Sequence, residues 1–312
     1  MSIGRFAPSP TGDLHLGNLR TAMLAWLWSR RESGRFIVRM EDLDRVTARR
    51  EHEASQLADL GAIGLDWDGV VVRQSERFDR YDAVLAELAE RDLTFECFCT
   101  RREIAEAASA PHGPSPTGLY PGTCKRLTTA ERNERLAAGR PAAIRLRSDH
   151  RHISIVDEVV GRYAGPVDDV VLRRNDGVPA YNLAVVVDDA AQGVDLVVRA
   201  DDLLDTVPAQ AELRRFVGAP PARYAHVPLV LSERGTRLAK RDGSVTLAER
   251  LAAGDSRLDV VRFLLRTIGV DPSPDAATPA ELLRAALEVF EPSRLPRGPL
   301  VIDDALLARR LR

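Results

Sequence analysis

The chain has 312 residues, of which 45% are hydrophobic and 29% are charged. This length and composition exclude a small disulfide-stapled module and a disordered chain, and they predict one large domain with an insertion, or two domains. The formal net charge of −2 provides no general basic surface, so a nucleic acid would have to bind a local patch.

The first sixty residues predict alternating strands and helices. Residues 3–7 are mostly apolar and are followed by a proline-containing loop, and from Gly17 onward apolar side chains recur at helical spacing. This pattern predicts strand, loop and helix. Residues 36–40 predict a second strand and residues 49–60 a second helix. The β-α-β-α order predicts a parallel sheet whose ligands bind at the carboxyl ends of its strands.

The middle of the chain predicts an inserted subdomain. A helix over 77–91 and a short strand over 94–99 precede a loop over 107–122 that is rich in Ala, Pro, Gly and Ser. A polar helix is predicted over 129–138, and further strands are predicted around Ile144 and Ile153.

The second half of the chain resumes the α/β alternation. Helices over 181–191 and 206–217 flank a strand over 196–199, and helices over 258–268 and 280–290 precede an arginine-rich tail. We therefore divide the chain into four parts. These are the first half of an α/β domain (1–96), an inserted subdomain (97–165), the second half (166–245) and a short helical C-terminal region (246–312).

Targeting signals are missing from the sequence. No run of about 18 apolar residues occurs, and the start from Met1 to Phe6 lacks the basic and apolar segments of a signal peptide. We therefore expect a cytoplasmic protein without membrane association. The three cysteines argue against a disulfide framework, which leaves reduced thiols or a metal site.

The loop from Pro8 to Asn18 is suited to a nucleotide. It places His15 and Gly17 where the first strand leads into a helix. A glycine lets the backbone approach a phosphate, the helix N-terminus offers unpaired N–H groups, and a histidine can donate to a phosphate oxygen. The alternative for so short a motif is a solvated turn.

A second basic loop lies far downstream, from Arg237 to Arg241. It contains Lys240, which with Lys125 is one of only two lysines in a chain otherwise rich in arginine. Codon bias explains the general skew, but a retained ammonium is a compact point charge that suits a leaving pyrophosphate. The alternative is a solvated charge run.

Together these two segments resemble the HIGH and KMSKS signatures of class I aminoacyl-tRNA synthetases, and the likeness is greatest for the glutamyl group. Residues 5–12, 40–44 and 198–204 are similar to further motifs of that group, so the resemblance covers about residues 3 to 245. It implies a Rossmann-like catalytic domain that activates L-glutamate with ATP and Mg²⁺. The second signature departs from the family pattern because it retains only the second lysine, Lys240.

The resemblance assigns roles to particular residues. Arg5 and Arg199 would face carboxylate, Tyr181 would add a hydroxyl, and Glu41 and Ser9 would hold the ammonium region. The implied glutamate site comprises Arg5, Phe6, Ala7, Pro8, Ser9, Glu41, Tyr181 and Arg199. The implied ATP site comprises His15, Gly17, Asn18 and Lys240, with His15 and Lys240 as the catalytic pair.

The cysteines suggest one structural zinc ion. Cys97, Cys99, Tyr120 and Cys124 resemble a zinc site of the shorter glutamyl-queuosine tRNA(Asp) synthetases, and zinc would organise a loop-rich insertion. His112 lies in the intervening loop and is a chemically more usual fourth ligand than tyrosine. Free cysteines are the alternative.

The acceptor follows from the same resemblance. The segment after Arg241 is too short for the helical anticodon-binding region of a conventional glutamyl-tRNA synthetase. The shorter family is therefore the better match, which implies tRNA-independent activation of glutamate by a monomer and transfer to the queuosine base of tRNA(Asp). The rival interpretations are a glutamyl- or glutaminyl-tRNA synthetase core, a non-tRNA adenylyltransferase and a noncatalytic RNA-binding paralogue.

Overall fold

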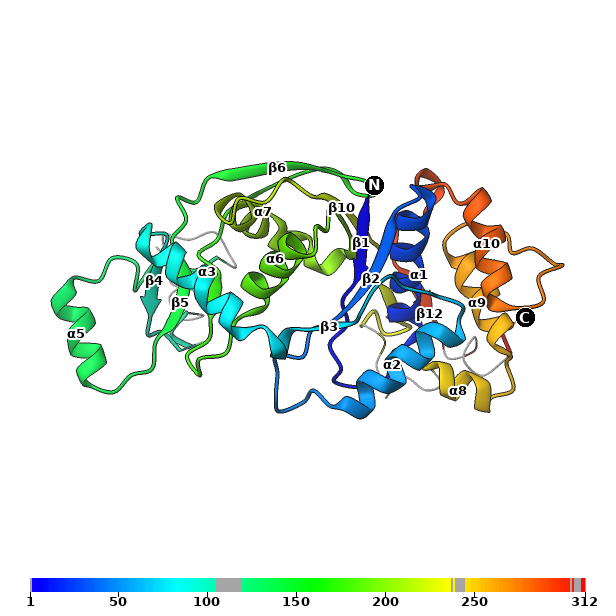
Figure 1. The fold of residues 1–312 in the computed structure, drawn as a ribbon, viewed down its shortest axis with the longest axis horizontal. Helices are drawn as coiled ribbons and strands as arrows, with labels where there is room; N and C mark the ends of the chain where they lie inside the picture. The colour runs from blue at the N-terminus through cyan, green and yellow to red at the C-terminus, as the bar shows by residue number, and fades with distance from the viewer. Residues whose placement is uncertain are drawn as a thin grey trace.

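The computed structural model describes residues 2–100, 102–104, 119–236, 238, 245–303, 305 and 310–311. The molecule is elongated (Figure 1), with a small sheet and helix α5 (Thr129–Ala137) at one end. Helices α9 (Arg257–Thr267) and α10 (Pro279–Val289) lie at the opposite end, and the central sheet lies between.

The central sheet has seven strands in the order β3-β2-β1-β9-β10-β6-β7. Every pairing is parallel except that of the β6–β7 hairpin, which confirms the predicted α/β class. The strands are β1 (Ile3–Phe6), β2 (Arg35–Met40), β3 (Val72–Arg73), β6 (His152–Asp157), β7 (Gly161–Pro166), β9 (Leu196–Ala200) and β10 (Arg223–Val227). The chain runs from β1 to β2 on one side and later returns to β9 on the other, so β1 and β9 form a switch point where ligands bind.

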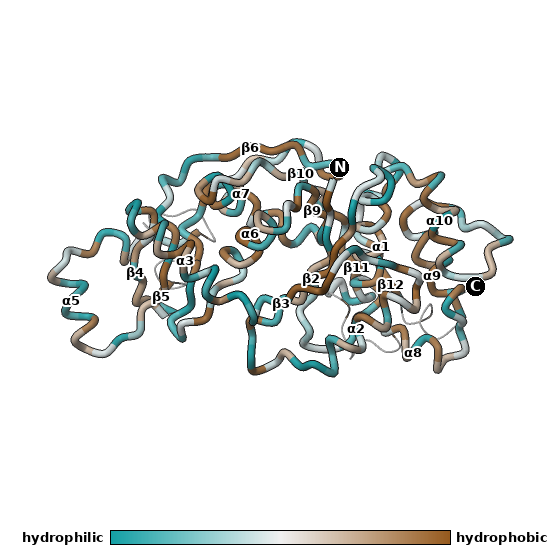
Figure 2. Tube along the Cα trace, in the orientation of Figure 1, coloured by the Kyte–Doolittle hydropathy of each residue, from teal (hydrophilic) through white to brown (hydrophobic). Residues whose placement is uncertain are grey.

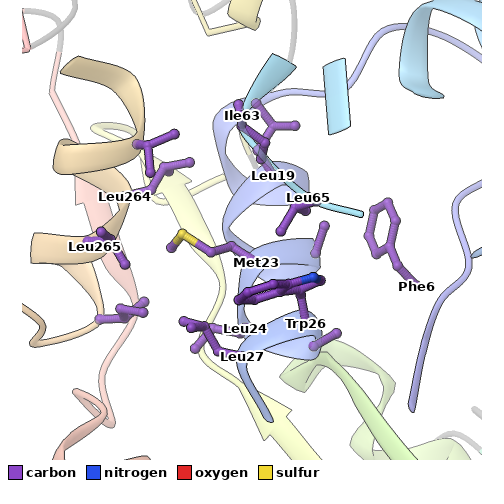
Figure 3. Packing of buried hydrophobic residues seen from close by; sticks show 14 of the residues in the cluster. Phe6, Leu19, Met23, Leu24, Trp26, Leu27, Ile63, Leu65, Leu264 and Leu265 are labelled. Atoms are coloured by element: carbon purple, nitrogen blue, oxygen red, sulfur yellow. The ribbon is translucent and has the colours of Figure 1, made fainter. Parts of the chain in front are cut away.

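Helix α1 (Leu16–Arg31) covers one face of the sheet and is buried nearly all round. Figure 3 shows Met23 of this helix directed toward Leu264 and Leu265 of α9, while Phe6 of β1 lies on the other side of the helix. Gly4 is required for the close approach of β1 to α1, because a Cβ there would lie 2.1 Å from Ser29 Oγ. Figure 2 shows the corresponding apolar character of the central strands β2 and β9.

The other face of the sheet is covered by α6 (Tyr181–Ala191) and α7 (Val207–Phe216). Helix α3 (Phe78–Glu90) packs against α6, and together they form a second apolar cluster. Helix α6 also carries Asp188 and Asp189, both buried, toward the sheet. This face therefore combines an apolar cluster with buried charge.

The small sheet contains β4 (Thr94–Cys97), β5 (Ala143–Leu146) and β8 (Val171–Arg173) in antiparallel pairing. The β6–β7 hairpin reaches from this end of the molecule to the central sheet, where Asp157 is in register with Tyr224 of β10. The hairpin thereby connects the small sheet with the strands that surround the switch point (Figure 1).

The predicted helices are confirmed within a few residues at their ends, including α2 (Arg50–Ala62) and α5. The sequence analysis missed the parallel pair of β11 (Val230–Ser232) and β12 (Leu300–Ile302). Further short elements are η1 (Gln74–Glu76), η2 (Asp201–Thr206), α8 (Leu247–Ala252) and η4 (Pro292–Arg294). No helix in the described part of the chain is long and apolar enough to cross a membrane.

Candidate active site

A cavity of about 560 Å³ lies at the carboxyl ends of β1, β2 and β9. Its lining includes all eight residues that the resemblance assigns to glutamate, together with His15 and Asn18 of the proposed ATP site. A smaller hollow of about 100 Å³ shares His15 and Asn18 and adds Gly17 and Val230. The structure therefore places the predicted glutamate residues and the described part of the predicted ATP site, His15, Gly17 and Asn18, around one region at the switch point.

Arg5, which lines this cavity, belongs to a network of buried arginines and carboxylates. Arg5 Nε lies 3.2 Å from Asp189 Oδ1, and Arg39 Nη1 lies 2.8 Å from the same oxygen. Arg39 also donates to Gln192 and is fully buried. Burial alone would raise the pKa of Asp189, but Arg5 and Arg39 hold it below its ordinary value. Asp189 therefore neutralises two arginines beneath the pocket.

Glu41 follows β2 and contacts the same network. Its carboxylate lies 3.4 Å from Arg39 Nη2, and its side chain is 10% exposed toward the cavity. Burial raises the pKa of Glu41 above its ordinary value, although Arg39 and Arg5 oppose this effect. A ligand ammonium beside Glu41 would replace the lost solvation of its carboxylate, so this side chain is suited to a cationic group.

Arg199, at the end of β9, is held by hydrogen bonds on every side. It donates to Tyr181 Oη at 3.2 Å, to Gln210 Oε1 at 2.8 Å and to Thr206 Oγ1 at 3.0 Å. Burial raises the pKa of Tyr181, so the phenol is protonated at neutral pH and retains an O–H to donate. The pair offers positive charge and a hydroxyl donor to the cavity.

The nucleotide loop leads into α1 through a capping box. Asn18 N–H donates to His15 Nδ1 at 3.2 Å, and His15 N–H donates to Asn18 Oδ1 at 3.1 Å. Because Nδ1 accepts, the hydrogen of the neutral imidazole resides on Nε2. A Cβ at Gly17 would lie 3.0 Å from the His15 ring, so the glycine permits this histidine position. The helix N-terminus and Nε2–H are the groups that anion binding uses.

The preceding loop is held in place by a side chain that the sequence analysis missed. Gln56 of α2 is buried and donates to the carbonyl oxygens of Ser9 and Gly12 at 3.1 and 2.7 Å. Glu41 N–H donates to Pro8 O at 2.9 Å. These bonds fix the loop that carries Ser9 against β2 and α2.

The second ATP signature falls mainly outside the described residues, because Arg237 and 239–244, including Lys240, are not among them. Val245, the first described residue after this gap, accepts a hydrogen bond from Leu16 N–H through its carbonyl oxygen at 2.8 Å. Thr246 forms a β-bridge with His15. The chain therefore returns from this signature directly beside the first one.

Cys97, Cys99 and Cys124 gather at the end of β4, with their Sγ atoms all within 4.8 Å of one another. Tyr120 Oη lies 3.3 Å from Cys97 Sγ and 3.6 Å from Cys99 Sγ, and Phe98 N–H donates to Cys124 Sγ. Thiolates that share a tetrahedral Zn²⁺ at about 2.3 Å lie about 3.8 Å apart. The cluster is thus compatible with a metal ion, whereas His112 lies outside the described residues.

Several residues around the cavity carried no recognisable signal in the sequence. Arg39 lies inside an apolar strand and Asp189 follows a run of valines. His226 lies on β10, next to β9, and Asp157 lies on β6, on the far side of β10. The one available signal is a charged residue within an apolar run, which is unusual unless the charge is paired. The partners themselves are distant in sequence.

The chain matches the family model for tRNA synthetases class I (E and Q), catalytic domain, over residues 3–283, and it belongs to this family. It is 60% identical over 301 residues to the glutamyl-Q tRNA(Asp) synthetase of Nocardia farcinica, covering 96% of this chain and 93% of that protein. The glutamyl-Q tRNA(Asp) synthetase of Cutibacterium acnes is 51% identical over 90% of this chain and 79% of its own length.

A solved structure supports the same assignment. The glutamate tRNA ligase of Elizabethkingia meningosepticum, in complex with its amino acid, superposes with a TM-score of 0.80 at 25% identity, covering 98% of this chain and 68% of that chain. The predicted class I resemblance is therefore confirmed, and the protein is a synthetase, an enzyme of the ligase class.

Proposed function

We propose that this chain activates L-glutamate with ATP, without tRNA, and transfers the glutamyl group to the queuosine base in the anticodon loop of tRNA(Asp). The observation that carries the activation step is the cavity at the switch point, where two arginines and Glu41 lie next to the capped N-terminus of α1. The acceptor is supported by the relatives that cover most of this chain, the glutamyl-Q tRNA(Asp) synthetases of Nocardia farcinica and Cutibacterium acnes.

The pocket is suited to a substrate with two carboxylates and one ammonium. Glu41 and Ser9 hold the ammonium region, while Arg5 and Arg199, with the Tyr181 hydroxyl, face carboxylate. The positive and negative groups are separated within one cavity, so the two ends of glutamate are distinguished by charge. Phe6, Ala7 and Pro8 complete the lining.

The first reaction is attack of the glutamate α-carboxylate on the α-phosphorus of ATP. An oxygen–phosphorus bond forms to give glutamyl-adenylate, and the bond to pyrophosphate breaks. His15, Gly17 and Asn18 position the phosphates at the N-terminus of α1, and Lys240 stabilises the charge that develops on pyrophosphate. Magnesium enters with ATP, and no protein nucleophile is required.

The second reaction transfers the glutamyl group. A hydroxyl of the queuosine cyclopentenediol attacks the carbonyl carbon of the adenylate, an ester forms, and AMP leaves. We propose that residues 97–165 form a subdomain inserted between the two halves of the catalytic domain, and that this subdomain contacts the RNA. A monomer in the cytoplasm, where ATP and tRNA are present, suffices for this reaction.

We propose that one zinc ion is held by Cys97, Cys99 and Cys124 with Tyr120 as the fourth ligand. The three thiols and the phenol converge in a small apolar cluster that includes Phe95. Zinc would supply structural order there rather than chemistry, because the cavity that holds glutamate is lined by none of these residues.

An exchange assay tests the activation step. Radioactive pyrophosphate should enter ATP when the protein is given L-glutamate and Mg²⁺ without tRNA, and L-glutamine or L-aspartate should support far less exchange. Exchange that depends on tRNA, or that proceeds equally with glutamine, would contradict tRNA-independent activation of glutamate.

A further inference from the structure

His226 lies next to the glutamate pocket and contacts one of its arginines. It is on β10, in register with Arg199 on the neighbouring strand β9, and it is fully buried. Arg199 Nε lies 3.0 Å from His226 Nε2. We propose that His226, anchored by Asp157, is a positioning residue that fixes the Arg199 guanidinium in the glutamate pocket. This inference rests on the proposed function of that pocket.

The geometry defines the hydrogen on the imidazole. A guanidinium N–H can only donate, so His226 Nε2 must accept and the ring hydrogen must reside on Nδ1. His226 Nδ1 lies 2.6 Å from Asp157 Oδ2, which accepts that hydrogen. Burial lowers the pKa of His226 although Asp157 opposes this effect, so the ring is neutral at physiological pH.

Asp157 anchors the ring from a third strand, β6. Its carboxylate also accepts backbone N–H bonds from Val159, Val160 and His226 itself. Burial alone would raise the pKa of Asp157, but its hydrogen bonds hold it below the ordinary value. A buried, ionised carboxylate with this many donors has little freedom to move, so its hydrogen bond to Nδ1 also restricts the orientation of the imidazole.

The remaining contacts of Arg199 show why its orientation matters. A guanidinium has five N–H donors. Nε binds His226, Nη1 binds Tyr181 and Gln210, and Nη2 binds Leu203 O and Thr206. With Nε fixed by His226, the edge that carries Nη1 is directed to Tyr181, whose ring lines the cavity. His226 thus acts on glutamate through Arg199 and Tyr181, without touching the ligand.

The test compares glutamate with ATP in the same assay. In His226→Leu and Asp157→Asn, KM for glutamate in pyrophosphate exchange should rise about 10-fold or more, the range expected when a hydrogen bond to a charged group is lost. KM for ATP should change less than about twofold. His226→Gln, whose Oε1 can accept from Arg199, should recover part of the lost affinity for glutamate.

Glu212→Gln is the matched control, because this buried carboxylate on α7 binds Arg151 and Arg215 away from the cavity. The positioning role is overturned if KM for glutamate is unchanged in His226→Leu and Asp157→Asn, or if both KM values rise together with a loss of melting temperature. If His226→Leu does not fold, Asp157→Asn and His226→Gln give the same comparison. Absence of glutamate-dependent exchange in the wild type would instead contradict the proposed function.

Discussion

The two arginines beneath the pocket share one carboxylate, Asp189, while Arg39 also lies near Glu41 and Asp188. Asp189 contacts both Arg5 and Arg39, and all three side chains are almost completely buried. Removal of one partner from a buried ion pair leaves an uncompensated charge, which is far more costly than loss of a surface pair. The positions of these charges therefore contribute to stability as well as to the shape of the pocket.

Asp189→Asn should lower the free energy of unfolding by about 3–5 kcal/mol, because two buried guanidinium groups lose their shared anion. Denaturant unfolding measures this change. Glu212→Gln serves as the comparison, since its partners Arg151 and Arg215 are about half exposed to solvent and the loss should be about 1 kcal/mol or less. Equal losses of unfolding free energy in the two variants would contradict the stabilising role of Asp189.

Glu41→Gln should raise KM for glutamate by roughly 10- to 100-fold, because an amide cannot neutralise the substrate ammonium. Burial raises the pKa of Glu41 in the free protein. Protonation then removes the charge as pH falls through that raised pKa, so KM of the wild type should increase toward acid pH. Steady-state exchange from pH 5 to 8 measures both effects. An identical pH dependence in Glu41→Gln would remove Glu41 from the ammonium site.

At the scale of residues, the sequence predicted those that belong to recognisable motifs. Arg5, Glu41 and Arg199 were found in this way, and the structure brings them to one cavity. Asp189 was missed because it pairs with Arg39, which lies 150 positions away in the sequence. His226 was missed because its contact with Arg199 depends on the pairing of strands β9 and β10. No local pattern carries that information.

At the scale of elements, the N-terminus of α1 joins the two ATP signatures. His15 caps the helix, and the chain that follows the second signature bridges to it through Thr246. Gly17 lies directly beneath the His15 ring, where an added Cβ would also lie 3.2 Å from Val230. The position of His15 thus depends on the absence of a side chain.

Gly17→Ala should raise KM for ATP several-fold by displacing His15, while helix propensity favours alanine by about 1 kcal/mol and limits any loss of stability. Gly61→Ala on α2 is the matched control, because a Cβ there meets no atom within 4 Å. It should stabilise the protein slightly and leave KM for ATP unchanged. Melting temperature and ATP-dependent exchange separate the two effects, and an unchanged KM in Gly17→Ala would exclude the packing role.

Metal removal tests whether the cysteine cluster holds a structural zinc ion. Metal analysis of protein purified without chelator should give about one zinc per chain. Chelation should lower the melting temperature, because a structural zinc contributes directly to folding, while wild-type exchange activity is largely retained. Cys124→Ser should show no such response to chelator. Protein without zinc, or a melting temperature insensitive to chelation, would contradict the zinc site.

Helices and long strands were predictable because apolar periodicity extends over many residues, as in α1 and α9. The pair β11–β12 was not, because each strand has three residues and the partners are about 70 positions apart. The position of β6 beside β10 depends on a single register contact between Asp157 and Tyr224. Such pairings are set by tertiary packing rather than by local preference.

At the scale of the whole molecule, the strands whose carboxyl ends line the cavity, β1, β2 and β9, lie between the small-sheet end and the helical end (Figure 1). The β6–β7 hairpin links these regions, and Asp157 on that hairpin contacts His226 beside the pocket. An RNA that binds the small-sheet end would therefore contact an element that also supports the glutamate site. The α/β class and the central site were predictable, whereas this connection required the pairing of β6 with β10.

The most direct test of the proposed function is glutamate transfer by the same protein to three RNAs: tRNA(Asp) that carries queuosine, tRNA(Asp) that lacks it, and tRNA(Glu). We predict that radioactive glutamate is attached to the first RNA alone, at the modified base, while pyrophosphate exchange into ATP proceeds without any tRNA. Attachment to the 3′ end of tRNA(Glu), or equal labelling of tRNA(Asp) without queuosine, would contradict it.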